Sequence, residues 1–194
     1  MPFEYYAENH DWDMTLRASW RLLISAQSLA RSTNVKDKNE LEFSFLTGGM
    51  LLAFCAIESF ITSIAFTMAR DKRYSGFDYR RYKEQRNFWG KIEMVCTALS
   101  IAVERSTEPF KTIEAMRTWR NSLVHASPYS IETVLILETK NSTELHNKLK
   151  IQPYTKAVQI EEAKAFYDAA FQLIDLVKKT SGFDPRAMCS YRVI

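Results

Sequence analysis

Glycine and proline are scarce in this sequence. They number 5 each among 194 residues, together about 5% of the chain, whereas average usage is about 12%. A β-sandwich or β-barrel needs a turn signal roughly every 8–12 residues, and this chain holds too few such residues to supply them. The same scarcity argues against long flexible linkers and low-complexity disorder. Since 46% of the residues are hydrophobic and 13% aromatic, the sequence predicts one mostly helical domain with a substantial core.

Cysteine is also rare, and Cys55, Cys96 and Cys189 lack the spacing of metal ligands. An odd, scattered set indicates reduced thiols in a cytoplasmic protein, with Cys55 and Cys96 acting as small hydrophobic residues of helices. The acidic N-terminal sequence lacks the basic-then-apolar order of a signal peptide. The sequence contains no zinc spacing, phosphate-binding glycine loop or serine-centred elbow, so it predicts neither a metal nor a cofactor.

One long apolar run has the length of a membrane span. Between Thr47 and Ala69 the sequence has a single charged residue, Glu58, and the run is long enough to cross a bilayer. Glu58 lies at the middle of the run, where a carboxylate costs about 3 kcal/mol on insertion scales. We therefore interpret the run as a buried core helix and expect no membrane association.

Apolar residues recur at the helical period in five segments. The sequence predicts helices over 10–33, 41–70, 90–105, from 108–109 to about 126, and over 158–180, with a short helix near 79–86. Gly48 and Gly49 are expected to allow the close approach of a neighbouring helix. Ser181-Gly182 is expected to end the last helix, because glycine is preferred just beyond a helix C-terminus.

The pattern changes between residues 131 and 152. Residues 131–139 are rich in β-branched side chains, 148–152 alternate strictly, and Lys140-Asn141-Ser142 lies between them. These features predict a β-hairpin inserted before the last helix. The expected fold class is therefore all-α, an antiparallel (up-down) bundle of about five helices with an inserted hairpin near 131–152. The chain is expected to form a single domain over 1–182, followed by a C-terminal tail at 183–194.

Positive charge is concentrated in residues 70–91. This segment has eight basic and three acidic residues, a net charge of +5, whereas the whole chain carries +3 and the remainder therefore −2. Its basic residues alternate with aromatic ones, a composition typical of single-stranded RNA binding. The residues assigned to RNA binding are Arg73, Arg80, Arg81, Lys83 and Arg86. The alternative is a solvated connector whose aromatic side chains pack on the bundle.

The helix that ends near 126 carries the sequence Trp119-Arg120-Asn121-Ser122-Leu123-Val124-His125. An Arg followed by a polar residue and, five positions after the Arg, by a His resembles the signature of the HEPN superfamily. The resemblance implies a small helical bundle that commonly dimerises and is in many members a metal-independent ribonuclease of toxin–antitoxin, antiviral or RNA-processing systems. It implies catalytic roles for Arg120 and His125, with Asn121 assisting. A subfamily is modified on a Tyr two residues after the His; this chain has Ser127 there, so regulation by nucleotide addition is not expected.

The chemistry can also be argued from the residues themselves. RNA cleavage without a metal needs a base for the 2′-hydroxyl, an acid for the leaving oxygen and a cation for the phosphorane. His125 titrates near neutral pH, and Arg120 is a permanent planar cation. Arg117, Asn121 and His125 share one helical stripe, so Arg117 is also assigned to RNA binding, where it would face a phosphate or solvent.

The spacing of the motif poses a geometric problem. Arg120 and His125 are five residues apart, which places them about 140° apart on an ideal helix. Three solutions stay open: Arg120 reaches around the helix, the helix distorts before Pro128, or two motifs meet across a dimer interface.

Glu58 is the fourth residue assigned to the catalytic site. A carboxylate within an apolar helix is rarely buried unpaired, so we expect it to pair with Arg120 or to orient His125. The alternative is a structural salt bridge with any nearby arginine. His10 and His146 lie in polar surroundings and are expected to be surface residues.

Three functional readings follow. The first is a cytoplasmic, homodimeric HEPN-like endoribonuclease that forms a 2′,3′-cyclic phosphate, with RNA and an antitoxin or regulatory protein as partners, and acts as a toxin or defence component. The second is a non-catalytic HEPN-type RNA-binding or protein-interaction module. The third is an unrelated helical scaffold in which the motif occurs by chance. The sequence contains no DNA-specific motif.

Overall fold

A computed structural model of the chain describes residues 3–8, 10–33, 35–124, 155, 157–186 and 188–193. Within these residues the chain forms six α-helices and the short 3-10 helix η1 (Lys72–Tyr74). The α-helices are α1 (Trp12–Ala30), α2 (Lys38–Met68), α3 (Tyr79–Glu84), α4 (Phe88–Ala98), α5 (Phe110–Val124) and α8 (Ile160–Ser181). The all-α class is thereby confirmed for the helical body. The predicted hairpin at 131–152 lies outside the described residues.

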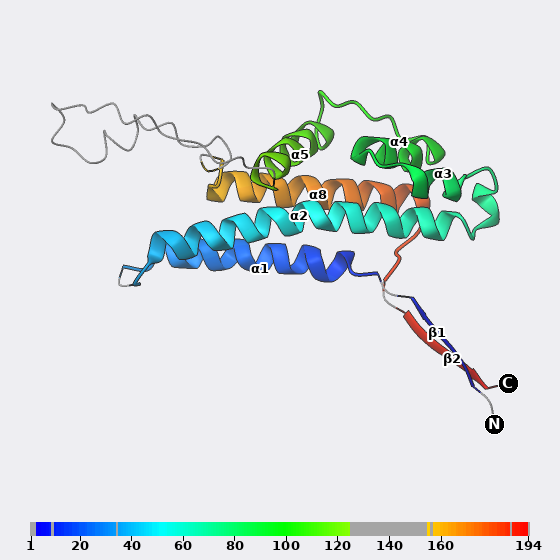
Figure 1. Cartoon of the computed structure of the whole chain (residues 1–194), viewed down its shortest axis with the longest axis horizontal. Coiled ribbons are helices and arrows are strands. Elements are labelled where there is room, and N and C mark those ends of the chain that lie inside the picture. The colour runs from blue at the N-terminus through cyan, green and yellow to red at the C-terminus, as the bar shows by residue number, and fades with distance from the viewer. Residues whose placement is uncertain are drawn as a thin grey trace.

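The three longest helices, α1, α2 and α8, lie side by side, and α4 and α5 cover α2 and α8 from the other side (Figure 1). Trp12 at the start of α1 packs against Phe60 near the end of α2, with ring centroids 5.0 Å apart, so these two helices are antiparallel. Arg73, just beyond α2, lies 3.4 Å from the carbonyl oxygen of Ser181 at the end of α8. The helices α2 and α8 therefore run in the same direction.

This parallel pair differs from the strictly up-down order that the sequence analysis expects. The chain returns along α5 before α8 begins, so α8 starts at the same end of the body as α2 (Figure 1). Where α5 meets α8, the rings of Trp119 and Phe166 pack edge to face, with their centroids 5.7 Å apart. Local periodicity predicts each helix but contains no information about which neighbour it lies beside.

The core is built around α2, which is apolar on nearly all sides. Met50, Ile57 and Ile64 have no exposed surface. Within the described chain, α2 is the one helix long and apolar enough to cross a membrane, and 61% of its apolar window is buried inside the protein. Packing on α1, α4, α5 and α8 thus covers most of this apolar surface.

Two glycines of α2 allow α1 to approach closely, as predicted. A β-carbon at Gly49 would lie 3.3 Å from the backbone oxygen of Ser19, and one at Gly48 would lie 3.1 Å from Leu22 Cδ1. In the space that this leaves, Ser19 Oγ donates a hydrogen bond of 2.7 Å to the carbonyl oxygen of Gly49. The hydroxyl is therefore satisfied although Ser19 is buried.

Local signals fix the ends of the helices near the cleft described below. Asp78 caps α3 by accepting a hydrogen bond of 2.9 Å from the backbone N–H of Arg81. Asn87 caps α4 in the same way through the N–H of Trp89, also at 2.9 Å. At the same end of the body as η1 and α3, α8 ends at Ser181, and Gly182 adopts the left-handed conformation with φ 71°, which confirms the predicted stop.

The two ends of the chain form a small ribbon. Strands β1 (Phe3–Glu8) and β2 (Met188–Val193) pair antiparallel, from Phe3 with Val193 to Glu8 with Met188. The ribbon projects from the helical body (Figure 1). The sequence predicts a C-terminal tail at 183–194, and no element is predicted before residue 10. Local patterns could not predict this pairing because nearly the whole chain separates the two strands.

Two expectations about single residues are wrong. His10 is buried, with 7% of its surface exposed, because the chain places it beside the ring of Phe66 on α2, 6.3 Å between centroids. Its polar neighbours in the sequence gave no sign of this long-range contact. Cys55 is exposed, since it lies on a side of α2 that the other helices leave open, whereas Cys96 is buried as expected.

Candidate functional site

A cleft of about 590 Å³ opens between α2, α4 and α5, and we call it the α2–α5 cleft. The segment that joins α3 to α4 closes one side of it. The residues that line it are Phe54, Glu58, Ile61, Thr62, Tyr82, Arg86, Asn87, Phe88, Lys91, Ile92, Arg117, Arg120 and Asn121. Four cations and one carboxylate are thus gathered around aromatic and aliphatic side chains.

The apolar side of α5 determines which residues face this cleft. Ile113 and Met116 have no exposed surface, and Trp119 is 5% exposed, so this stripe of α5 is buried in the body. Arg117, Arg120 and Asn121 lie outside that stripe and are half-buried at the cleft. The packing of α5 therefore turns its polar motif toward Glu58 of α2.

Arg120 and Asn121 are joined directly. The Arg120 Nη1 donates a hydrogen bond of 3.2 Å to Asn121 Oδ1, and the guanidinium lies over the ring of Phe54 at 6.0 Å. The amide oxygen and the ring orient the guanidinium without neutralising its charge. The described residues contain no ion pair of Arg120, so its charge remains available to an anion in the cleft.

Arg117, in contrast, already has a carboxylate partner. Its Nη2 lies 2.7 Å from Glu114 Oε1 in an ion pair along α5. Glu114 also accepts a hydrogen bond from the indole N–H of Trp89 on α4. The hydrogen bond from Arg117 holds the pKa of Glu114 below its usual value. Arg117 is therefore a fixed and largely neutralised part of the wall.

Glu58 lies in the same cleft as Arg120, as one of the two hypotheses for it requires. Burial raises the pKa of the Glu58 carboxyl, while the charges of Arg120 and Lys91 partly offset this effect. In the described part of the chain Glu58 forms no ion pair, so neither the expected pair with Arg120 nor the alternative structural salt bridge is found there. A carboxyl group with a raised pKa beside cations is suited to proton transfer.

The floor of the cleft is formed by a neutral tyrosine. Tyr82 is 1% exposed, and its hydroxyl lies 3.1 Å from Thr62 Oγ1 on α2. Burial raises the pKa of Tyr82 to about 12. Tyr82 therefore stays protonated at neutral pH and contributes shape and a hydroxyl group, without a charge.

The sequence analysis assigned no role to Lys91, Asn87 or Phe54, although all three line the cleft. The cap at Asn87 begins α4, and Lys91 follows one turn later on the same side. The cap and the helical spacing together could have predicted that Lys91 and Phe88 share a face. The contact of that face with Arg120 depends on tertiary packing.

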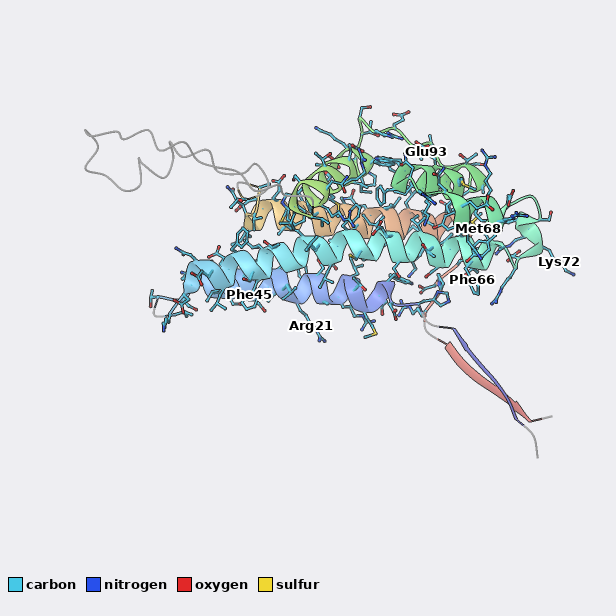
Figure 2. The ribbon with its side chains drawn as sticks, viewed as in Figure 1. Arg21, Phe45, Phe66, Met68, Lys72 and Glu93 are labelled. Carbon is cyan, nitrogen blue, oxygen red and sulfur yellow. The ribbon has the colours of Figure 1, made fainter. Side chains whose placement is uncertain are left out.

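The basic segment at 70–91 does not act as one surface. Arg86 lines the α2–α5 cleft, whereas Arg73 and Arg81 line a second hollow of about 640 Å³ between α3 and α4, which we call the α3–α4 pocket. Arg80 and Lys83 line neither hollow, and Arg80 forms an ion pair with Glu84 at 3.1 Å. Figure 2 labels Glu93, which lines the α3–α4 pocket, on the edge of the body opposite Arg21 of α1.

The aromatic residues of this segment belong in part to the core. Trp89 is 2% exposed, and Tyr82 is buried as described above. Tyr74, Phe77, Tyr79 and Phe88 are half-buried against the core. This packing agrees with the alternative hypothesis, a connector whose aromatic side chains pack on the bundle. Phe77 nevertheless lines the α3–α4 pocket, and Phe88 lines the α2–α5 cleft.

His125 and His146 lie outside the described residues, so the structure places Arg120, Asn121 and Glu58 together without their histidine. Over the described ranges the chain has no cluster of three or more side chains that could hold a metal ion. In comparisons with known proteins, no family model, no curated protein and no solved structure matches this chain.

Proposed function

We propose that this protein is a HEPN-like, RNA-directed protein and a metal-independent endoribonuclease. The observation that carries the proposal is the shared α2–α5 cleft, in which Arg120 and Asn121 of the motif helix face Glu58 of α2. Lys91 and Arg86 add positive charge to the same cleft, which suits a phosphodiester backbone. The half-buried ring of Phe88 supplies a stacking surface for a base.

The proposed reaction is attack of a 2′-hydroxyl on the adjacent phosphorus. A base takes the 2′-hydroxyl proton, the bond to the 5′-oxygen breaks, and an acid protonates that oxygen, which leaves a 2′,3′-cyclic phosphate and a 5′-hydroxyl. Glu58 in its carboxylate form acts as the base, and the imidazolium of His125 acts as the acid. Arg120 stabilises the charge that develops on the phosphorane, and Asn121 holds the guanidinium in place.

The direct test is cleavage of single-stranded RNA by the purified full-length chain in the presence of a chelator. We expect products with a 2′,3′-cyclic phosphate, identified by mass spectrometry, and no cleavage at a 2′-deoxy position. Arg120→Ala should lower the rate about 100-fold or more, since it removes the cation at the phosphorane. Arg21→Ala is the matched control, because Arg21 is an exposed arginine on the opposite edge of the body.

Full activity of His125→Ala would contradict the proposed mechanism. RNA that binds in the α2–α5 cleft without being cleaved would favour the second candidate, a non-catalytic HEPN-type RNA-binding or protein-interaction module. The ion pair of Arg117 with Glu114 favours this candidate in one respect, because it gives one cation of the motif helix a structural role. Wild-type protein that neither binds nor cleaves RNA would leave a protein-interaction module and the unrelated scaffold as the remaining hypotheses.

We also propose that the protein acts as a homodimer in the cytoplasm, as a toxin or defence component held in check by an antitoxin or regulatory protein. The separation of Arg120 and His125 by about 140° on a helix motivates the dimer, since two motifs can complete each other across an interface. Mixing inactive Arg120→Ala with inactive His125→Ala tests this idea. Recovery of activity in the mixture supports a composite site, and a monomeric mass in solution contradicts it.

A further inference from the structure

The α3–α4 pocket, about 640 Å³, has no role in the function proposed above. It lies between the η1–α3 segment and α4, directly beside the α2–α5 cleft. Gln85 and Gly90 line the pocket, whereas their chain neighbours Arg86 and Lys91 line the cleft. The two hollows therefore adjoin each other along the turn between α3 and α4 and the first turn of α4. An extended ligand bound in one hollow can reach the other past this segment.

All but one of the charged side chains that line the pocket form a hydrogen bond or an ion pair. Asp78 caps α3, Glu93 forms an ion pair with Arg105, and Arg73 forms one with Asp71 at 2.8 Å. The guanidinium of Arg81 makes no hydrogen bond or ion pair with any residue that the structure describes. Arg81 is therefore the cation of this pocket that is available to an anionic ligand.

The rest of the lining is suited to a base. Phe77 and Tyr74 are half-buried and present aromatic surface to the pocket. Gln85 lies against Gly90 with its Oε1 accepting a hydrogen bond of 2.9 Å from the backbone N–H of Asn87, so its amide NH₂ is left to donate. Single-stranded RNA is recognised by this combination of stacking surface, amide donor and cation.

We propose that the α3–α4 pocket is a nucleotide subsite, which holds a base and its adjacent phosphate, while further phosphates of the same single-stranded RNA lie in the α2–α5 cleft. The proposal rests on the proposed function and deepens it. Arg81 binds the phosphate next to this base, and Gln85 donates to the edge of the base. The subsite makes the protein select RNA long enough to occupy both hollows.

The test measures binding of a trinucleotide and an octanucleotide of single-stranded RNA to the full-length chain by fluorescence anisotropy over a range of salt concentrations. Arg81→Ala should weaken binding of the octanucleotide about tenfold and that of the trinucleotide much less. It should also reduce the salt slope by about 0.7, which corresponds to one lost phosphate contact on a single strand.

Arg80→Ala is the matched control. It removes the same charge from the adjacent position of the same helix, but Arg80 is paired with Glu84 and lines neither hollow. A second variant, Gly76→Trp, adds a bulky side chain at the pocket, where a β-carbon has no atom within 4 Å. It should weaken the octanucleotide selectively, and its folding is checked by thermal unfolding.

The outcomes separate the two proposals. If the wild type binds RNA and Arg81→Ala behaves like Arg80→Ala, the subsite is wrong and the proposed function stands. Equal losses for the trinucleotide and the octanucleotide in Arg81→Ala would also overturn it, because the effect would then belong to the cleft. A wild-type chain that binds neither oligonucleotide overturns the proposed function and the subsite together.

Discussion

The core between α1, α2 and α8 and the α2–α5 cleft differ in the polar groups that they contain. The helix α2 contributes residues to both regions. Ile57 of α2 is completely buried, and the next residue, Glu58, lies in the cleft. Toward α1 the helix presents glycines and aliphatic side chains, whereas its polar residues Glu58 and Thr62 line the cleft. Because successive residues of a helix are rotated by about 100° around its axis, neighbouring residues of α2 can lie one in the core and the other in the cleft.

The largest effect should come from the packed side of α2. Ile57→Ala leaves a cavity at a position with no exposed surface and should lower the free energy of unfolding by about 2–5 kcal/mol. Urea unfolding followed by circular dichroism measures this. Glu58→Gln, one residue away, is the matched control and should cause no comparable loss. Equal destabilisation by the two substitutions would contradict the division of α2 into two sides.

The close approach of α1 to α2 should be the next most sensitive feature. Gly49→Leu forces a side chain against the backbone oxygen of Ser19 and should cost about 1–3 kcal/mol. The same substitution at Gly76, where a β-carbon meets nothing within 4 Å, should stay within about 0.5 kcal/mol. Thermal unfolding of the two variants compares them. A Gly49→Leu protein as stable as Gly76→Leu would show that the helices can separate freely.

On the cleft wall, the cap of α4 should have an intermediate effect. Asn87→Ala removes the side chain that accepts the N–H of Trp89 and should cost about 1 kcal/mol. Hydrogen exchange should increase in the first turn of α4. Asn87→Asp keeps a capping oxygen and should restore most of the stability. If Asn87→Asp is as unstable as Asn87→Ala, the cap is not what holds this end of α4.

The pH dependence of stability should have opposite signs at Glu58 and Glu114. Since burial raises the pKa of folded Glu58, its ionisation costs stability above that pKa, and the cost is absent below the unfolded value of about 4.3. Glu58→Gln should therefore be more stable than the wild type at pH 8 and lose this advantage below about pH 4.

Glu114 provides the reverse case. Arg117 lowers its pKa, so the ion pair contributes above the unfolded pKa and is lost as pH falls through the folded one. Glu114→Gln should be slightly less stable at pH 8, by less than about 1 kcal/mol because the pair is partly exposed, and this loss should disappear at acidic pH. Unfolding curves between pH 3 and pH 8 test both variants, and shifts of the same sign would contradict the comparison.

The helices could be predicted from sequence because their signals are local. Apolar periodicity, Gly48-Gly49 and the stop at Gly182 each work within a few residues of the element that they define. The parallel run of α2 and α8, the terminal ribbon and the burial of His10 could not be predicted in this way. Each depends on contacts between segments that are far apart in the chain.

The residues of the candidate site likewise fall into those that local sequence patterns identify and those that only the tertiary structure identifies. Arg120 and Asn121 could be found by motif, and Glu58 by its position in an apolar helix. Their meeting in one cleft was a hypothesis that the sequence could not test. Lys91 and the division of the basic segment between two hollows required the structure, because adjacent residues such as Arg80 and Arg81 have the same composition signal and different surroundings.

The contact between Gln85 and Gly90 makes these two positions interdependent. A β-carbon at position 90 would lie 2.4 Å from Gln85 Nε2, so any residue other than glycine there requires Gln85 to move. Gln85 also accepts a hydrogen bond from the N–H of Asn87, which begins α4. A substitution at 90 should therefore displace the Gln85 side chain and its hydrogen bond with Asn87, and a simultaneous change at 85 should remove that part of the effect. Such a paired change would alter the lining of the α3–α4 pocket and leave the residues that line the α2–α5 cleft in place, with non-additive effects of the two neighbouring positions.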